Sequence, residues 1–256
     1  MTAPILEVQG LNKSFGGVQA VQDMNFTIGK GELAALIGPN GAGKTTIFNL
    51  VTGVYGVSSG EILFKGESVL NTRTDRIVMK GISRTFQNLR LFGQSSVLEN
   101  IMTAMQLHRG YNFLQAVFHT AGCRRREREI HAESMALLER VGLADRAEQE
   151  AGTLPYGLQR RLEMARALAL KPELLLLDEP AAGMNAEEVD QLNKLIVDIH
   201  RDFGLTILLI EHHMDLVMEI CPHIVCLNFG AKIAEGTPRD IQTNRDVLTA
   251  YLGEED

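Results

Sequence analysis

The sequence predicts an α/β fold with a mainly parallel sheet, and three observations support this prediction. A glycine-rich segment, Gly38–Thr45, follows a short apolar run. A second apolar run, Leu174–Leu177, ends in Asp178 and Glu179. Apolar and amphipathic stretches then alternate as far as Leu227, as in strands joined by right-handed crossover helices. Such a sheet binds its ligand at the carboxyl ends of its strands, so we expect the functional residues there.

The composition is that of an ordinary globular protein. The 256 residues are 45% hydrophobic and 22% charged, which is enough to bury a substantial core. The formal net charge of -7 provides no global positive field and disfavours nucleic-acid binding. No apolar run approaches the ~18 residues needed to cross a bilayer, and no secretory signal is visible at the amino terminus. We therefore expect any membrane function to depend on a partner.

The three cysteines do not predict a disulfide framework, because their number is odd and they lack zinc spacing. Cys221, His223 and Cys226 suggest a metal site at first sight. However, Cys226 lies in the apolar run 223–227, where a small buried thiol is the commoner explanation. The sequence therefore favours a reduced, cytoplasmic protein.

The first part of the chain has the pattern of short strands separated by glycines. The third strand leads directly into the glycine-rich segment, and the residues that follow, 45–52, have the apolar spacing of a helix that ends at Gly53. Strand, loop and helix thus follow in the order that a phosphate-binding loop requires. The expected strands are Ile5–Gln9, Val21–Ile28, Gly31–Ile37 and Glu61–Phe64.

The middle of the chain, from about residue 88 to 169, has a helical pattern. In its charged stretch, Ile130, Leu137, Leu138 and Val141 share one helix face, while arginines and glutamates fill the others. Mixed charges at this spacing indicate a solvated helix surface rather than a nucleic-acid or lipid site. The expected helices are Leu98–Leu107, Arg124–Val141 and Gln159–Leu170.

Strands and helices alternate again near the carboxyl terminus. This alternation places Asp178, Glu179 and His212 at the carboxyl ends of strands. The expected strands are Leu174–Leu177, Leu205–Ile210 and Ile224–Leu227, and the expected helices are Glu187–Phe203 and Met214–Ile220.

The glycine-rich segment has the residues of a phosphate site. Gly38, Gly41 and Gly43 allow the backbone to curl, so that successive N–H groups point inward at a helix amino terminus. Lys44 is expected to reach the terminal phosphates of a nucleotide, and the Thr45 hydroxyl to hold Mg²⁺.

The second segment supplies two carboxylates. Four apolar residues predict a buried strand that delivers Asp178 and Glu179 at its exposed end. Asp178 is expected to support Mg²⁺, and Glu179 to orient or deprotonate the attacking water. The combination with an upstream phosphate loop predicts a nucleoside triphosphatase rather than a simple strand end.

Three further residues each have two interpretations. His212 lies where a strand end would let it hydrogen-bond a γ-phosphate, although a single histidine is more often structural, and His213 is its neighbour. Gln87 follows the candidate strand Ile82–Phe86 and would contact Mg²⁺ or the water, or be a surface amide. Phe15 would stack on a base or belong to the core.

In this order, these residues resemble those of the ATP-binding cassette (ABC) family of transporter ATPases, over nearly the whole chain. The resemblance implies a P-loop NTPase core with a mainly parallel sheet, an N-terminal antiparallel β-subdomain and an inserted α-helical subdomain. It implies a single ABC ATPase domain, 1–256, whose helical signature subdomain, about 88–165, is inserted into a nucleotide-binding core, 1–87 and 166–256. It also implies ATP and Mg²⁺ as cofactors.

The family resemblance assigns roles to the site residues. Phe15 becomes the platform for adenine, Gln87 the link between nucleotide and membrane subunit, and His212 the γ-phosphate switch beside the catalytic Glu179. The metal ligands implied are Thr45, Gln87 and Asp178. The nucleotide-binding residues implied are Phe15, Gly38, Pro39, Asn40, Gly41, Ala42, Gly43, Lys44, Thr45 and Thr46.

The family also implies that two cassettes face each other head to tail, each ATP lying between one phosphate loop and the other subunit's signature. The signature residues that would face the partner's ATP are Leu154, Pro155, Tyr156 and Gly157.

Three longer segments narrow the resemblance. Residues 82–92, 154–168 and 210–215 look like the LivG-type ATPases of high-affinity branched-chain amino-acid uptake. This implies a second ABC ATPase as heterodimer partner, two membrane permease subunits and an external solute-binding protein, with no nucleic acid. It implies a peripheral position on the cytoplasmic face of the inner or plasma membrane. Because other subunits choose the cargo, a lipid-export or urea-uptake ATPase is the alternative.

The sequence departs from the family pattern in three places. The usual signature is Leu-Ser-Gly-Gly-Gln, whereas this chain has Pro155 and Tyr156 after Leu154, so a serine hydroxyl and one N–H are lost. Residues 181–185 replace the usual Ser-Ala-Leu-Asp segment, and His213 replaces an aspartate. We therefore expect an asymmetric heterodimer in which this chain's phosphate loop forms the faster site.

Two rival classes lack their own sequence features. A cassette protein that acts on DNA or ribosomes would carry a long coiled-coil insertion or a second fused cassette, and neither is present. A P-loop kinase or GTPase would not need residues 154–161. A GTPase would also show Asn-Lys-x-Asp, whereas Asn193 and Lys194 are followed by Leu195 and Ile196.

Overall fold

The computed structural model describes residues 4–108 and 121–252, and the chain divides into two compact units. The first unit comprises Met1–Gln87 and Glu173–Asp256, and the second comprises Asn88–Pro172. The second unit thus begins at about the residue expected for the helical subdomain and runs to Pro172, past the end of its last helix at Ala169.

The first unit begins with a four-stranded antiparallel sheet in the order β2-β1-β4-β5. Its apolar side chains alternate with polar ones, as expected for a sheet with one face on the core. The strands are longer than the sequence pattern indicates because their polar ends still pair. Their bounds are β1 Pro4–Phe15, β2 Val18–Gly29, β4 Ser59–Phe64 and β5 Glu67–Ser68.

The second sheet of this unit has six strands in the order β10-β9-β3-β8-β7-β6. All neighbouring pairs are parallel except β9 and β10. The central strands β3, β7 and β8 are buried at every residue, so they show the continuous apolar runs that the sequence analysis recognised. The strands are β3 Leu33–Ile37, β6 Ile82–Arg84, β7 Leu174–Asp178, β8 Thr206–Ile210, β9 His223–Asn228 and β10 Ala231–Gly236.

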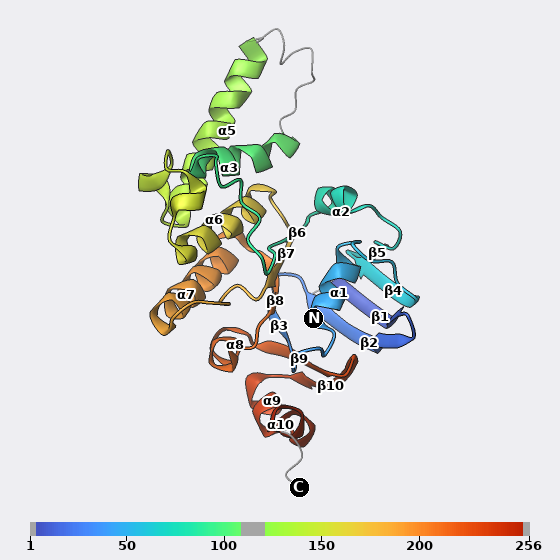
Figure 1. Ribbon diagram of the computed structural model, residues 1–256. Coiled ribbons are helices and arrows are strands. Elements are labelled where there is room, and N and C mark those ends of the chain that lie inside the picture. The colour runs from blue at the N-terminus through green and yellow to red at the C-terminus, as the bar shows by residue number, and fades with distance from the viewer. Residues whose placement is uncertain (1–3, 109–120, 253–256) are drawn as a thin grey trace. The chain divides into compact units, whose positions relative to one another are not determined.

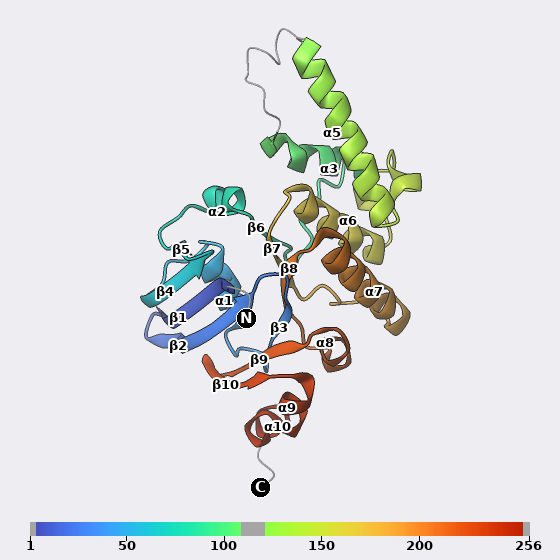
Figure 2. The same cartoon turned by 180° about the vertical axis from the view of Figure 1, so that it is seen from behind.

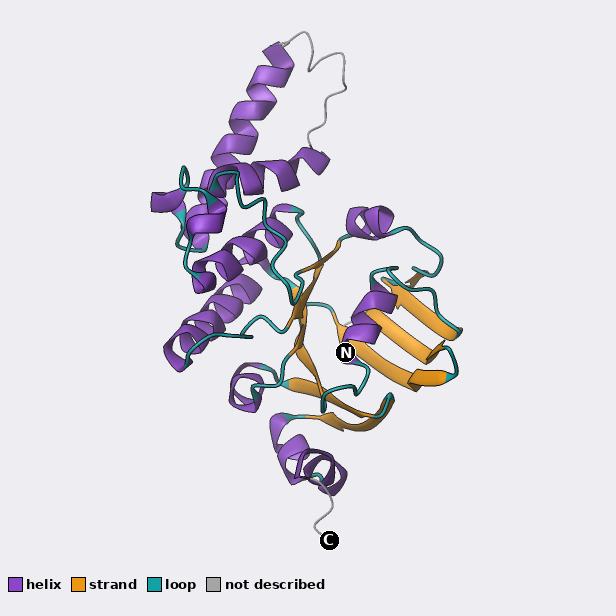
Figure 3. Ribbon diagram, in the orientation of Figure 1, coloured by secondary structure: helices purple, strands orange, loops and turns teal. Residues whose placement is uncertain are grey.

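Helices cover both faces of the six-stranded sheet (Figures 1 and 2). In both views α7 and α8 lie on one side, and α1 and the antiparallel sheet lie on the other. The orange strands of Figure 3 show the two sheets of this unit. The helices are α1 Lys44–Val51, α2 Thr74–Lys80, α7 Ala186–Phe203, α8 Met214–Ile220, α9 Pro238–Thr243 and α10 Arg245–Leu252.

One hydrophobic core joins the two sheets of the first unit. Phe48 of α1 is fully buried and belongs to the same cluster as Leu6 and Val8 of the antiparallel sheet and Leu176 and Leu208 of β7 and β8. This packing fixes α1, and with it the loop that precedes α1, against the carboxyl ends of the parallel strands. The expected α/β class with a mainly parallel sheet and an N-terminal antiparallel sheet is confirmed.

The second unit is helical. The side chains that the sequence analysis assigned to one face of its charged helix are buried, which confirms that prediction: Ile130, Leu137, Leu138 and Val141. The elements are α3 Val97–Met105, η1 Gln106–His108, α5 Ala121–Arg140, η2 Ala144–Arg146, η3 Ala151–Thr153 and α6 Tyr156–Ala169. Across residues 4–108 and 121–252, no helix combines the length and apolar character required to span a bilayer.

Candidate functional site

The glycine-rich loop connects the end of β3 to the start of α1, and two of its glycines are required by close packing. Gly38 has φ +148°, and a Cβ atom there would lie 2.2 Å from the carbonyl oxygen of Leu227. Gly43 has φ +100°, and its Cβ would lie 2.5 Å from the carbonyl oxygen of Ala20. A side chain at either position would push the loop away from the strands that support it.

Lys44, the first residue of α1, folds back over this loop. Its side chain is buried, and Nζ donates to the carbonyl oxygens of Gly38 at 2.6 Å and Pro39 at 3.0 Å. Burial lowers the pKa of Lys44, and the negative charges of Glu179 and Asp178 oppose this effect. A cation therefore lies at the loop, within electrostatic reach of both acids.

Asp178 ends β7 and is held by a buried ion pair. Its Oδ2 lies 2.6 Å from Nη2 of Arg84, the last residue of the neighbouring strand β6. Nη1 of Arg84 donates to Oδ1 of Asn49 on α1 at 2.7 Å, and the guanidinium lies 5.5 Å from the ring centre of Phe48. Arg84 thus connects the acid of β7 to the helix that follows the phosphate loop.

Glu179 follows directly and has an unusual backbone. Its φ of +48° lies in the left-handed region, where a residue with a side chain is strained. Its N–H donates to the carbonyl oxygen of Ile210 at 2.9 Å. Its carboxylate accepts from Nε2 of Gln87 at 2.6 Å through Oε2, and Oε1 lies 3.5 Å from Nδ1 of His212.

The structure therefore brings most of the sequence-predicted chemistry together: Lys44, Gln87, Asp178, Glu179 and His212. Gln87 differs in one respect, because β6 ends at Arg84 rather than at Phe86, which leaves Gln87 in the segment after the strand. Thr45 and Asn40 are exposed, and Thr46 is half-buried, in the first turn of α1 and the loop before it.

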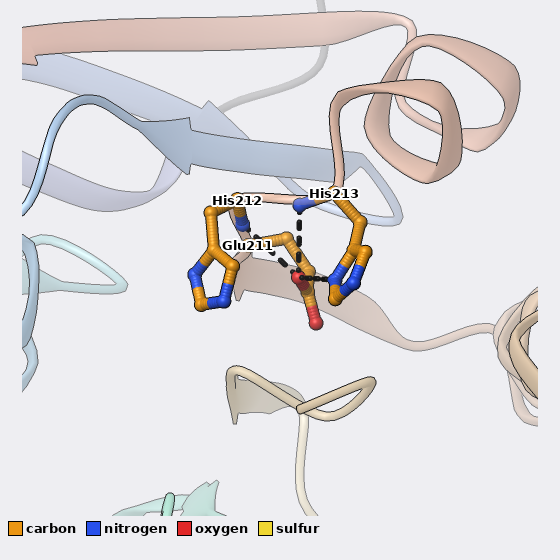
Figure 4. Close-up of side chains that lie close together, drawn as sticks. All are labelled: Glu211, His212 and His213. Atoms are coloured by element: carbon orange, nitrogen blue, oxygen red, sulfur yellow. Dashed lines mark hydrogen bonds and ion pairs between the residues drawn. The ribbon is translucent and has the colours of Figure 1, made fainter. Parts of the chain in front are cut away.

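Glu211 joins two of these segments and was missed by the sequence analysis. It is fully buried after β8. Oε1 accepts from the N–H of Ala181 at 2.8 Å. Oε2 accepts from the N–H groups of His212 at 3.0 Å and His213 at 3.3 Å, and lies 3.1 Å from Nδ1 of His213. Figure 4 shows His212 on one side of the Glu211 side chain and His213 on the other.

Phe15 ends β1 and is 41% exposed, so it is not a core residue. Its ring meets Tyr55 edge to face at 5.2 Å, and Nζ of Lys13 lies 4.7 Å from its centre. Among the described residues, no hydrogen bond, ion pair or ring contact joins Phe15 to the phosphate loop. It is an accessible aromatic surface, as a base platform requires.

The signature segment belongs to the second unit, at the start of α6. Leu154 is buried, and Pro155 occupies the N-cap position without a side-chain hydrogen bond. Oη of Tyr156 accepts from Nε and Nη2 of Arg160 at 3.0 and 2.7 Å. Arg160 also forms a buried ion pair with Glu163 at 3.2 Å. The tyrosine that replaces glycine is therefore fixed along the helix by a buried guanidinium.

Cys123, Cys221 and Cys226 are all buried, and for Cys226 this confirms the expectation. Burial raises the pKa of Cys221 to about 12 and that of Cys226 to about 11, so both thiols are protonated near neutral pH. His223 instead lies between two carboxylates, Glu32 at 2.8 Å and Glu235 at 3.0 Å. These contacts do not support the metal hypothesis for Cys221, His223 and Cys226.

Two sequence families match the chain. Residues 21–182 match the family described as ABC transporter, and residues 231–256 match the family described as branched-chain amino acid ATP-binding cassette transporter. The chain is 48% identical to the high-affinity branched-chain amino acid transport ATP-binding protein BraF of Pseudomonas aeruginosa, over 99% of this chain and 100% of BraF. It is 43% identical to LivG of Escherichia coli, which has the same description, with the same coverage.

A solved structure has the same fold. The ADP conformation of MJ1267, an ATP-binding cassette of an ABC transporter, superimposes with a TM-score of 0.85 at 28% identity, over 99% of this chain and 100% of MJ1267.

Proposed function

The chain belongs to the ABC transporter family, and from this premise we propose that it is the ATP-hydrolysing subunit of an importer of branched-chain amino acids. The observation that carries the proposal is the convergence of Lys44, Glu179 and His212 beside the phosphate loop. The names of BraF and LivG and the match at residues 231–256 support this cargo over the lipid-export or urea-uptake alternative.

ATP binding is expected to use the backbone of the loop and Lys44. Backbone N–H groups of the loop around Gly41 and the amino terminus of α1 would suit a phosphate anion. The Nζ of Lys44, now on the carbonyls of Gly38 and Pro39, would donate instead to the terminal phosphates. Phe15 would stack on the adenine through its exposed ring.

Hydrolysis is assigned to Glu179 and His212. The Glu179 carboxylate would orient the attacking water or take its proton, with Gln87 fixing one carboxylate oxygen. His212, 3.5 Å from the other oxygen, would donate to the γ-phosphate oxygen as negative charge develops.

The residues near the loop fit Mg²⁺, because the Thr45 hydroxyl, the Gln87 amide oxygen and the Asp178 carboxylate are the oxygen donors this ion prefers. These three residues would hold it. When bound, the ion neutralises charge on the phosphates. The ion pair with Arg84 holds the Asp178 carboxylate in one orientation at the end of β7.

The rest of the assembly is also part of the proposal. A second, different ABC ATPase would meet Leu154–Gly157 with its own ATP, and two permease subunits would dock near residues 87–92. An external binding protein would deliver the amino acid. The chain would then lie peripherally on the cytoplasmic face of the membrane, and ATP would act by favouring the closed pair of cassettes.

Uptake by the reconstituted complex tests this function. We expect the complex to import labelled leucine, isoleucine or valine but not urea, and Lys44→Ala to abolish import. Lys194→Ala, which changes an exposed lysine on α7, is the matched control. Unchanged import with Lys44→Ala would refute the ATPase role, and import of urea alone would refute the cargo.

A further inference from the structure

The buried carboxylate of Glu211 bridges the segment after Glu179 and the segment that carries His212. We propose that Glu211 is a positioning residue. It fixes the position of the proposed base, Glu179, relative to the proposed phosphate contact, His212. This inference rests on the proposed function. It assigns a role to a side chain that is fully buried.

The two oxygens of Glu211 divide their hydrogen bonds between the two segments. Oε1 binds the N–H of Ala181, two residues after Glu179. Oε2 binds the N–H groups of His212 and His213. Because Glu211 is fully buried, water does not compete for these donors, and the carboxylate has a strong electrostatic preference for this arrangement.

The same contacts explain how Glu179 keeps its strained backbone. The N–H of Glu179 binds the carbonyl oxygen of Ile210, and the N–H of Ala181 binds the next residue of that strand end, Glu211. Hydrogen bonds to consecutive residues therefore hold the left-handed φ of +48° from both sides. Loss of the second bond would let the Glu179 side chain move away from Gln87 and His212.

His213 contributes a side-chain contact to the same oxygen. Its Nδ1 lies 3.1 Å from Oε2 of Glu211, and its ring stacks on that of His212 at 5.3 Å with an angle of 27° between the planes. An Nδ1–H donor would hold the carboxylate through Oε2, whereas Ala181 holds it through Oε1. His213, which stands where an aspartate was expected, therefore helps to hold Glu211 in place.

Glu211→Gln is the informative change, because an amide keeps the shape but replaces one acceptor oxygen with a donor group. An N–H donor would then face either Ala181 or the two histidines. In the assembled complex, we expect kcat to fall about 100-fold, as for a misplaced reacting group. The dissociation constant for ATP should stay within about twofold, because the phosphate loop is unchanged. Glu148→Gln, an exposed glutamate, is the control.

A double variant separates positioning from general structural damage. If Glu211 acts through Glu179, then Glu211→Gln with Glu179→Gln should hydrolyse ATP at the rate of Glu179→Gln alone, within about threefold. Wild-type kcat in Glu211→Gln would overturn the inference. So would a double variant whose losses multiply, or an ATP affinity that falls as much as kcat.

His213 provides a milder pair of variants that keeps the inference testable if Glu211→Gln does not fold. His213→Ala removes the side-chain contact to Oε2, and we expect kcat to fall about 10-fold from the loss of one charge-assisted hydrogen bond. His213→Asn, whose amide donates from a similar place, should restore most of that loss. Equal rates for the two variants would overturn the inference. If Glu179→Gln itself hydrolyses ATP at the wild-type rate, the proposed function fails instead.

Discussion

Two helix amino termini of this protein are candidates to meet phosphate, and they are built differently. Before α1, the loop at Gly38–Gly43 is supported by backbone contacts that only glycine permits, and Lys44 lies over it. Before α6, Pro155 offers no N–H, and Tyr156 is bonded to Arg160. The amino terminus of α1 has the hydrogen-bond donors that a phosphate site needs. The amino terminus of α6 lacks the N–H of residue 155, and its Tyr156 side chain is held in place by Arg160. This difference indicates that the two ATP sites of the proposed heterodimer need not be equivalent.

The largest expected effect tests the buried ion pair between Arg84 and Asp178, which supports the amino terminus of α1. Arg84→Met would leave Asp178 buried without its 2.6 Å ion pair, and the free energy of unfolding should fall by about 3–5 kcal/mol. Urea denaturation measures it. Arg201→Met, which removes exposed ion pairs to Asp198 and Asp202, should change the free energy of unfolding by less than about 1 kcal/mol. Equal losses in the two variants would show that Arg84 does not brace this side.

A pair of glycine variants tests the loop itself. Gly38→Ala would bring a Cβ to within 2.2 Å of the Leu227 carbonyl oxygen, so we expect a loss of about 2–4 kcal/mol and impaired ATP binding. Gly41→Ala meets no atom within 4 Å, so it should cost only the left-handed backbone penalty of about 1–2 kcal/mol. Thermal unfolding and ATP titration measure both effects. The reverse ranking would contradict the close packing described for Gly38.

The α6 side is tested by Tyr156→Phe. The change removes the hydroxyl that accepts two hydrogen bonds from Arg160, and we expect a loss of about 1–3 kcal/mol in the free energy of unfolding. Tyr55→Phe, at a tyrosine that is 41% exposed, should have almost no effect. If both variants unfold like the wild type, the side chain of Tyr156 does not stiffen this terminus.

The smallest expected effect tests the loss of hydrogen-bond donors at Pro155. Pro155→Ser restores one N–H and one hydroxyl, and a net hydrogen bond of about 0.5–1.5 kcal/mol predicts a 2- to 10-fold faster turnover at the ATP site that faces this signature. The rate should be measured in a complex that also carries Glu179→Gln, so that the opposite site dominates. A slower rate would reverse the asymmetry proposed for the heterodimer.

The phosphate loop and the acid pair were predictable because each depends on a short local pattern. Gly38–Thr45 combines a strand end, glycines and a helix start. A run of four leucines predicts the buried strand before Asp178. Helix α8 has the bounds expected from the sequence. Strand β10 was not expected, because its residues are only partly buried and form an edge strand without a clear alternation.

Arg84 and Glu211 escaped prediction for a different reason. Their roles depend on which strands are neighbours, and this order is not written in any local pattern: β6 and β8 both flank β7, although they lie far apart in the sequence. A signal existed in each case. A charged residue that directly ends or follows a buried strand, as Arg84 and Glu211 do, must find a partner. The identity of that partner required the sheet order.

The most direct test is the fate of ATP bound to a complex that carries Glu179→Gln in this chain and an unaltered partner. We expect ATP to bind to this chain's phosphate loop with normal affinity and to be recovered from it as ATP, because a missing general base slows hydrolysis by about 10²- to 10⁴-fold. Recovery of this nucleotide as ADP at the wild-type rate would show that Glu179 is not the catalytic base.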